Sequence, residues 1–262
     1  MAEPQIQFND GAAYERMMGA WSRLAGEIFL DWLAPRPGLA WVDVGCGNGA
    51  FTELIVQRHA PREVQGVDPS DGQLAYARTR PGTRMATYHQ GDAMALPFPD
   101  RSFDAAVMAL VIFFVPDPAK GVAEMARVVS PGGTVAAYAW DMDGGGFPLE
   151  PVLVEMRAMG FAPLRPPSAD ASRVENLKKL WRDAGLQEIE TRRIDVTRRF
   201  SDYEDFWSAS TSGSTVKPAI AAMTPDMVAE LKQRVRAHLT EDAAGRITYD
   251  AFANAVKGRV PG

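Results

Sequence analysis

The stretch WVDVGCGNGAF, residues 41–51, decides the fold of this chain. A short apolar strand contains Asp43 and runs into Gly45, Gly47 and Gly49, which are spaced two residues apart. A helical pattern follows at once. Glycine allows positive φ angles and lets a ligand come close to bare backbone. A strand, a glycine-rich loop and a helix N-terminus in this order form a nucleotide-binding corner of an α/β sheet.

The composition is that of an ordinary soluble globular protein. The chain has 262 residues, of which 46% are hydrophobic and 23% are charged, and this fits one large domain. A net charge of -5 argues against a nucleic-acid surface. Cys46 is the single cysteine, which excludes an internal disulfide and fits a reducing compartment. Because the sequence shows neither a long apolar run nor a signal peptide, we expect a cytoplasmic protein without a membrane partner.

Strand and helix patterns alternate after the glycine loop. Because such a rhythm forms a parallel sheet with right-handed crossovers, we expect the chain to fold that way. The predicted strands are 41–45, 63–68, 85–90, 103–109 and 134–140, and the predicted helices between them are 49–59, 70–79 and 118–129.

The second half of the chain completes the sheet and adds two irregular insertions. Capping boxes at Ser70–Gln73 and at Ser172–Glu175 each predict the start of a helix. Thr224 and Pro225 read as the cap and first residue of another helix. Further helices are predicted at 10–33, 150–160, 172–185 and within 201–240, and further strands at 187–198 and 246–257.

These elements predict an α/β fold of the Rossmann-like kind. We expect seven mostly parallel strands with helices on both faces and one antiparallel strand near an edge. The whole chain, 1–262, forms a single domain with N-terminal helices at 10–35. Helical insertions at about 142–171 and 201–244 are expected to lie as a lid over the ligand edge of the sheet.

Two nucleotides compete for the glycine loop. Gly45-x-Gly47-x-x-Ala50 satisfies a relaxed dinucleotide pattern, with Asp68 at a suitable distance for a ribose contact. The other candidate is S-adenosylmethionine, which carries a sulfonium and an α-ammonium but no phosphate. Asp43, two residues before the first glycine, repels pyrophosphate and favours a cation, and no Lys or Arg lies between positions 42 and 57 to offset it.

Several further segments resemble one family in the right order. They are VDVGCGNGAF at 42–51, GVDPSDGQL at 66–74, GDAMALPFPDRSFDAAV at 91–107, PDPAKGVAEMARVVSPGG at 116–133 and YERMMGAWSRLAGEIFLDWLAP at 14–35. With these segments the chain resembles the class I S-adenosylmethionine-dependent methyltransferases, in the small-molecule branch that includes quinone-biosynthesis-type enzymes. The match is good over about residues 10–141 and looser beyond.

The resemblance implies a cofactor site on the loops after the strands. The three loop glycines would bring backbone close to the methionine part of S-adenosylmethionine, and Asp43 would hold that end through its ammonium or through the loop amides. Asp68 would accept both ribose hydroxyls with charge-assisted hydrogen bonds. The remaining implied contacts are Pro69 and Leu74 near the adenine, Asp92 on its amino group, the Ala93 amide on its ring nitrogen, Met108 beside the cofactor, and Tyr14 and Arg23 covering it.

The same resemblance implies methyl transfer to a small molecule, with S-adenosylhomocysteine as product, but it assigns no catalytic residue. The segment Met108–Val111 after the fourth strand carries no polar side chain, which favours an apolar or aromatic acceptor. Tyr14, Trp140 and Asp141 are candidates to orient it. No metal is expected, because the three histidines show no ligand spacing.

Two other functions stay open at this point. An unreactive segment beside the methyl group is also compatible with a protein that binds S-adenosylmethionine or S-adenosylhomocysteine without catalysis. An NAD-dependent oxidoreductase is the third hypothesis, and it predicts nicotinamide binding instead.

Overall fold

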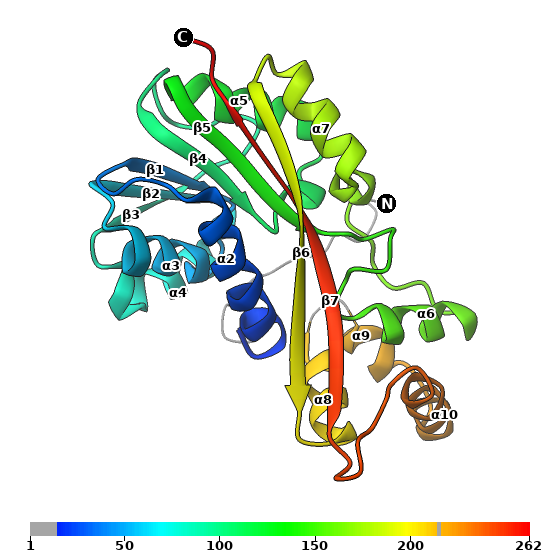
Figure 1. The fold of residues 1–262 in the computed structure, drawn as a ribbon. Coiled ribbons are helices and arrows are strands. Elements are labelled where there is room, and N and C mark those ends of the chain that lie inside the picture. Colours follow the sequence, from blue (N-terminus) through cyan, green and yellow to red (C-terminus); the bar gives the residue numbers. More distant parts are fainter. Residues whose placement is uncertain (1–14, 214–215) are drawn as a thin grey trace.

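A single seven-stranded sheet organises the molecule (Figure 1). The computed structural model describes residues 15–213 and 216–262. The strand order is β3-β2-β1-β4-β5-β7-β6. The strands are β1 (Ala40–Val44), β2 (Glu63–Asp68), β3 (Ala86–Gln90), β4 (Phe103–Ala109), β5 (Val129–Trp140), β6 (Gln187–Phe200) and β7 (Ile247–Arg259).

The predicted mixture of strand directions is confirmed. Strands β1 to β5 pair in parallel, whereas β7 runs antiparallel to both of its neighbours, β5 and β6. The central strands are buried along almost their whole length, as the continuous apolar run 103–109 predicted. Strand β5 begins earlier than predicted, because Val129 already pairs with Phe103 before the register shifts.

Helices cover both faces of the sheet. Helix α2 (Ala20–Leu33), which continues from the π-helix η1 (Glu15–Gly19), lies on one face with α3 (Ala50–His59) and α4 (Asp71–Thr79) (Figure 1). Helices α5 (Pro118–Val128) and α7 (Val174–Asp183) cover the other face. The predicted N-terminal helix is confirmed from residue 15, and its first part, residues 10–14, lies outside the described residues.

Of the two predicted capping boxes, one does start a helix with its serine as cap and the other does not. Ser70 caps α4 by accepting the Gln73 N–H at 3.3 Å, as predicted. The second capping box is wrong, because Ser172 ends the short 3-10 helix η4 (Ala169–Ser172) instead of preceding α7. Its hydroxyl donates to the Ala169 carbonyl oxygen at 2.6 Å and accepts the Met142 N–H at 3.1 Å, so it has no role at the helix start.

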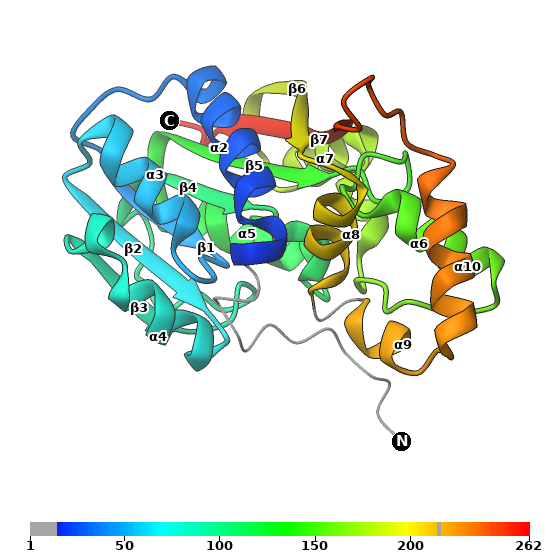
Figure 2. The same cartoon turned by 90° about the horizontal axis from the view of Figure 1, so that it is seen from below.

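The two insertions gather at one end of the molecule, beside the long antiparallel pair of β6 and β7 (Figures 1 and 2). They hold α6 (Glu150–Ala158), α8 (Tyr203–Thr211), α9 (Lys217–Ala221) and α10 (Pro225–Arg236). Thr224 caps α10 by accepting the Met227 N–H at 3.3 Å, as predicted. Among the helices in the described parts of the chain, none combines the length and the apolarity needed to cross a membrane.

Candidate active site

A cavity of about 950 Å³ follows the carboxyl ends of the parallel strands. Its wall includes Asp43 from β1, Asp68 from β2, Asp92 after β3 and Ala109 from β4. Open α/β sheets bind ligands at this edge, where the connections leave in opposite directions. The volume lies at the upper end of the range of about 300–1,000 Å³ for small-molecule pockets, so it leaves room for a cofactor and a second molecule.

The N–H groups of the glycine loop donate hydrogen bonds to other groups of the protein. Gly45 and Cys46 both donate to the Val67 carbonyl oxygen, at 2.7 and 3.0 Å. Gly47 donates to Asp68 Oδ2 at 2.9 Å. A loop that cradles a pyrophosphate needs such N–H groups pointing at the ligand. The geometry therefore speaks against the dinucleotide reading of this loop.

Gly45 and Gly47 need glycine for different reasons. Both have positive φ angles, +73° and +52°, which residues other than glycine rarely adopt. A Cβ on Gly45 would lie 2.4 Å from a methyl carbon of Val111, so the loop packs tightly on the segment after β4. A Cβ on Gly47 would meet no atom within 4 Å and would face the cavity, where a ligand can approach the backbone.

Asp43 is fully buried at the base of the cavity. Its Oδ2 accepts the Thr52 hydroxyl at 2.6 Å, while Oδ1 has no hydrogen-bond partner among the described residues. The pKa of Asp43 is raised to about 7: burial raises it most, the Thr52 hydrogen bond lowers it, and the nearby charge of Asp68 adds a smaller increase. A positively charged group placed beside it would restore the ionised form.

Asp68 holds the glycine loop and faces the cavity at the same time. Its Oδ2 accepts the Gly47 N–H and its Oδ1 accepts the Ser70 N–H, both at 2.9 Å. Burial raises its pKa, and these two hydrogen bonds oppose the shift. Each carboxylate oxygen can accept a second hydrogen bond, so contacts to a ribose remain possible.

Several of the other residues predicted to contact the cofactor line the cavity. Pro69, Asp92 and Ala93 line the cavity, and Asp92 also turns the chain by accepting the Met94 N–H at 2.8 Å. Arg23 lines the cavity, but its side chain is 62% exposed and pairs with Glu27 at 3.0 Å.

Three predicted residues do not line the cavity, and a fourth cannot be placed. Leu74 packs beneath the loop against Cys46, and Met108 is buried with its terminal methyl near Gly121. Gly49 packs on the far side of the loop instead. Tyr14 lies outside the described residues.

Sequence reasoning missed Gln73. It was interpreted only as part of a capping box, yet it lines the cavity and is 3% exposed. Its Oε1 has no partner within residues 15–213 and 216–262, because the Ser70 N–H that would complete the box is already bonded to Asp68. A buried acceptor without a donor is rare in proteins, and here it faces a site for a ligand.

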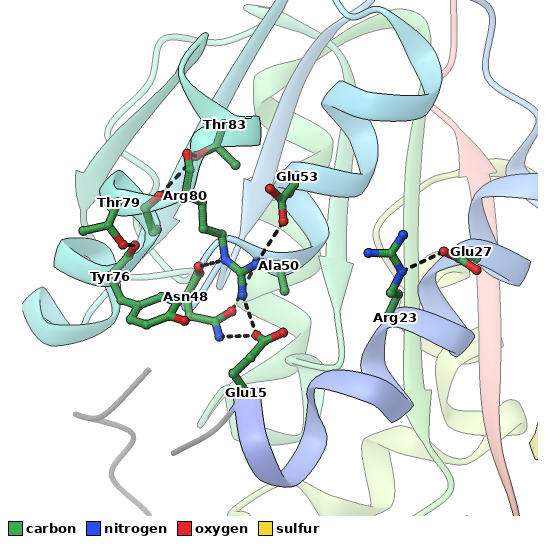
Figure 3. Close-up of polar contacts among 11 residues, drawn as sticks. Glu15, Arg23, Glu27, Asn48, Ala50, Glu53, Tyr76, Thr79, Arg80 and Thr83 are labelled. Atoms are coloured by element: carbon green, nitrogen blue, oxygen red, sulfur yellow. Dashed lines mark hydrogen bonds and ion pairs between the residues drawn. The ribbon is translucent and has the colours of Figure 1, made fainter. Parts of the chain in front are cut away.

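An arginine from the end of α4 also reaches the cavity wall (Figure 3). We call Arg80 and its partners Glu15, Asn48 and Glu53 the Arg80 cluster. Arg80 donates to the Asn48 carbonyl oxygen at 2.7 Å and to Glu53 at 2.9 Å, and it also pairs with Glu15. Asn48 donates to the same Glu15 carboxylate at 2.9 Å. The sequence hid this cluster because its members are up to 65 positions apart.

Another part of the cavity wall is apolar. It is formed by Ala109, Leu110, Val111, Phe114, Val115, Pro116 and Pro167, which we call the apolar end. Leu110 adopts a φ of +64°, a strained value for a residue with a side chain, where β4 meets the cavity. Ser168 fixes the segment that carries Pro167 by donating to the Val115 carbonyl oxygen at 2.8 Å.

Of the three residues proposed to orient an acceptor, Tyr14 lies outside the described residues, and Trp140 and Asp141 do not line the cavity. Trp140 is buried, and Asp141 accepts a hydrogen bond from Asn254 at 2.9 Å. Tyr138, which sequence reasoning did not select, does line the cavity, as does Arg165 from the first insertion. No described residue of the second insertion does so. Over 15–213 and 216–262, no group of three acidic, histidine or cysteine side chains is arranged to hold a metal ion.

The strand order and the cavity at the carboxyl ends of the strands define a Rossmann-like α/β fold with a ligand site. Residues 42–137 match the family model described as a methyltransferase domain. This match and the relatives below support a class I S-adenosylmethionine-dependent methyltransferase, as the resemblance predicted.

The relatives reach only part of the chain. A demethylmenaquinone methyltransferase of Desulfitobacterium hafniense is 38% identical over 107 residues, which cover 39% of this chain and 42% of that protein. The chain thus spans less than half the length of the first curated relatives that it matches.

Solved structures share the fold over almost the whole chain. Phosphoethanolamine N-methyltransferase 2 of Haemonchus contortus, in complex with S-adenosyl-L-methionine, has a TM-score of 0.60 and 19% identity, over 96% of this chain and 57% of that one. The [4+2]-cyclase SpnF has a TM-score of 0.57 and 22% identity, over 93% and 82%. Because both identities are low, these likenesses establish the fold alone.

Proposed function

We propose that this protein transfers the methyl group of S-adenosylmethionine to an apolar, hydroxylated aromatic small molecule of the quinol kind. One observation carries the proposal: a single cavity joins an acidic end, whose glycine-loop N–H groups are used up, to an apolar end. The first end suits a cationic cofactor and the second suits an aromatic ring. The relative named for demethylmenaquinone supports the choice of acceptor.

The cofactor end acts by charge and by hydrogen-bond acceptors. Bound S-adenosylmethionine supplies a methyl group on a sulfonium, and an in-line nucleophile can displace it. Asp43, with one bare oxygen, accepts from the ammonium or stabilises the positive charge, and Asp68 accepts from the ribose. Asp92 and Ala93 flank the position expected for the adenine.

The apolar end acts by excluding water and aligning the acceptor. Alignment of reacting atoms can contribute about 7–11 kcal/mol, so a dedicated base is not required for methyl transfer. Val111 packs against Gly45, so the apolar end directly adjoins the glycine loop. An acceptor held there would attack the methyl carbon as the carbon–sulfur bond breaks, and its proton would pass to solvent outside the apolar end.

A second function keeps support from the same end. No polar side chain stands at positions 109–111, where β4 ends and the cavity begins. The chain can therefore be a binding protein that senses S-adenosylmethionine or S-adenosylhomocysteine without turning it over.

One set of measurements separates these functions. Calorimetry with S-adenosylhomocysteine and with NAD tests the cofactor. Turnover is then measured, as S-adenosylhomocysteine release, against quinols, simple phenols and carboxylic acids. Methylation of quinols supports the proposal, and methylation of carboxylic acids alone contradicts the acceptor class. Tight binding without turnover on any acceptor favours the sensor.

A further inference from the structure

The N-terminal helices form one wall of the cavity. Glu15 and Gly19 from η1 and Ser22 and Arg23 from α2 line it. In Figure 3 the start of this wall lies directly across from the glycine loop, with Arg80 between them. A ligand in the cavity is thus enclosed between two segments that are distant in sequence.

One guanidinium joins this wall to the loop. Arg80 is 13% exposed and holds acceptors from three elements: Glu15 on η1, the Asn48 carbonyl oxygen in the glycine loop and Glu53 on α3. Arginine suits such a site because its planar group presents several donors in fixed directions. Glu15 also accepts from Asn48, so two hydrogen bonds connect it to the loop side.

The positive charge of Arg80 stabilises the contact between η1 and the glycine loop. Glu15 and Glu53 both point at Arg80, and Asp43 and Asp68 lie at the same end of the cavity. Without the guanidinium, the carboxylates of Glu15 and Glu53 would face each other with no cation between them, which favours separation of η1 from the loop.

We propose that Arg80 is a positioning residue that holds the N-terminal wall against the glycine loop. The Arg80–Glu15 pair opens when the cofactor enters and leaves. This inference rests on the proposed function, because it takes S-adenosylmethionine as the occupant of the cavity.

The test compares Arg80→Met, Arg80→Lys and Glu15→Gln with Arg84→Met, which removes an exposed arginine four positions away. Binding of S-adenosylhomocysteine is measured by calorimetry and its release by stopped flow. Arg80→Met is expected to raise Kd by about tenfold or more, the scale of one charge-assisted hydrogen bond. Arg80→Lys recovers part of this loss, because an ammonium keeps the charge but lacks the planar set of donors of the guanidinium.

Glu15→Gln isolates the opening step. Its side chain is 38% exposed, and the substitution leaves the Arg80–Glu53 pair intact, so the fold is kept even if Arg80→Met fails to fold. We expect the release rate of S-adenosylhomocysteine to rise by more than its Kd, because a weaker link also speeds entry.

Comparison of two ligands distinguishes positioning from charge alone. Removal of a cation would by itself favour the positively charged S-adenosylmethionine over S-adenosylhomocysteine. Loss of positioning instead weakens both by the same factor. Variants that match Arg84→Met in Kd and release rate, with wild type still binding, overturn only the inference. Wild type that binds neither ligand overturns the proposed function, and the inference with it.

Discussion

The two ends of the cavity are built in opposite ways. At the acidic end, Asp43 and Gln73 each leave a buried oxygen atom that no described residue contacts by a hydrogen bond, and Arg80 ties together segments from three elements. At the apolar end, residues 109–111 and 114–116 offer mainly hydrocarbon, and the one conspicuous feature is the strained backbone of Leu110. The difference teaches that, on the proposed function, the acidic end recognises its ligand by hydrogen bonds and charge, whereas the apolar end selects by shape and polarity.

Gly45→Ala should have the largest effect, because it damages the junction of the two ends. A left-handed alanine costs about 1–2 kcal/mol, and the clash with Val111 adds about 1–3 kcal/mol of overpacking. Urea unfolding should show this loss of stability, and Val111→Ala in the same chain should recover part of it. Gly47→Ala, with open space around its Cβ, should weaken S-adenosylhomocysteine binding more than it lowers stability. Equal losses of stability in the two variants would contradict the distinction.

Asp68→Ala should weaken S-adenosylhomocysteine binding by about 1.5–3 kcal/mol, the scale of hydrogen bonds to a charged group. The carboxylate is expected to hold the ribose, and it also accepts the Gly47 and Ser70 N–H groups. Calorimetry checks the affinity, with Asp71→Ala on the exposed first turn of α4 as control. Unchanged affinity in Asp68→Ala would rule out the ribose contact.

Asp43 should make binding depend on pH. Its pKa of about 7 lies above the ordinary value of 3.8, so between these values the native protein keeps a proton that the unfolded chain has lost. Stability of the ligand-free protein therefore falls as pH rises through this window. Affinity for the cationic S-adenosylmethionine should rise about tenfold between about pH 6 and pH 8 as Asp43 ionises. Calorimetry at several pH values checks this, and Asp43→Asn should flatten most of the dependence.

Gln73→Met should move stability and binding in opposite directions. The substitution removes a buried acceptor that lacks a partner, so the ligand-free protein should gain about 1 kcal/mol of stability. If Oε1 accepts from the adenosine part of the cofactor, S-adenosylhomocysteine affinity should fall about three- to tenfold. Thermal unfolding and calorimetry measure the two effects, with Gln57→Met on the exposed face of α3 as control. Affinity that stays at the wild-type value would show that Gln73 does not contact the cofactor.

Phe114→Ala should act on the acceptor and leave the acidic end untouched. Loss of apolar contact in a ligand pocket costs about 1–3 kcal/mol, and that cost should appear in the KM for the acceptor. The Kd for S-adenosylhomocysteine should stay constant. A change in cofactor affinity as large as the change in acceptor KM would mean that the two ends do not act separately.

The sequence predicted the scaffold well because hydrophobic pattern and turn chemistry are local. Strands 63–68 and 103–109 were predicted with the bounds that the structure shows, and the seven-stranded sheet with one antiparallel strand was confirmed. The box at Ser172 failed because a partner from residue 142, outside its own segment, engages the serine hydroxyl. Local patterns do not contain such distant competitors.

The site was predicted only in part, because local patterns do not contain the distant contacts that orient each side chain. Asp43, Asp68 and Asp92 line the cavity because strand ends in a parallel sheet meet at one edge. Leu74 and Met108 follow the same strand–helix pattern but are buried beneath the loop and against α5. Which side of an element faces the cavity depends on packing, and the family-like spacing does not report it.

By itself, the sequence determined the strand–glycine loop–helix corner and the class of the fold, and it predicted that Asp43 favours a cation. These follow from neighbouring residues, whose spacing fixes backbone geometry and local charge. Only the tertiary structure decided that Gln73 Oε1 lacks a partner, that the loop N–H groups are occupied and that Arg80 joins Glu15 to Asn48. Such facts depend on which distant groups compete for each hydrogen bond, and that competition is settled only when the chain is folded.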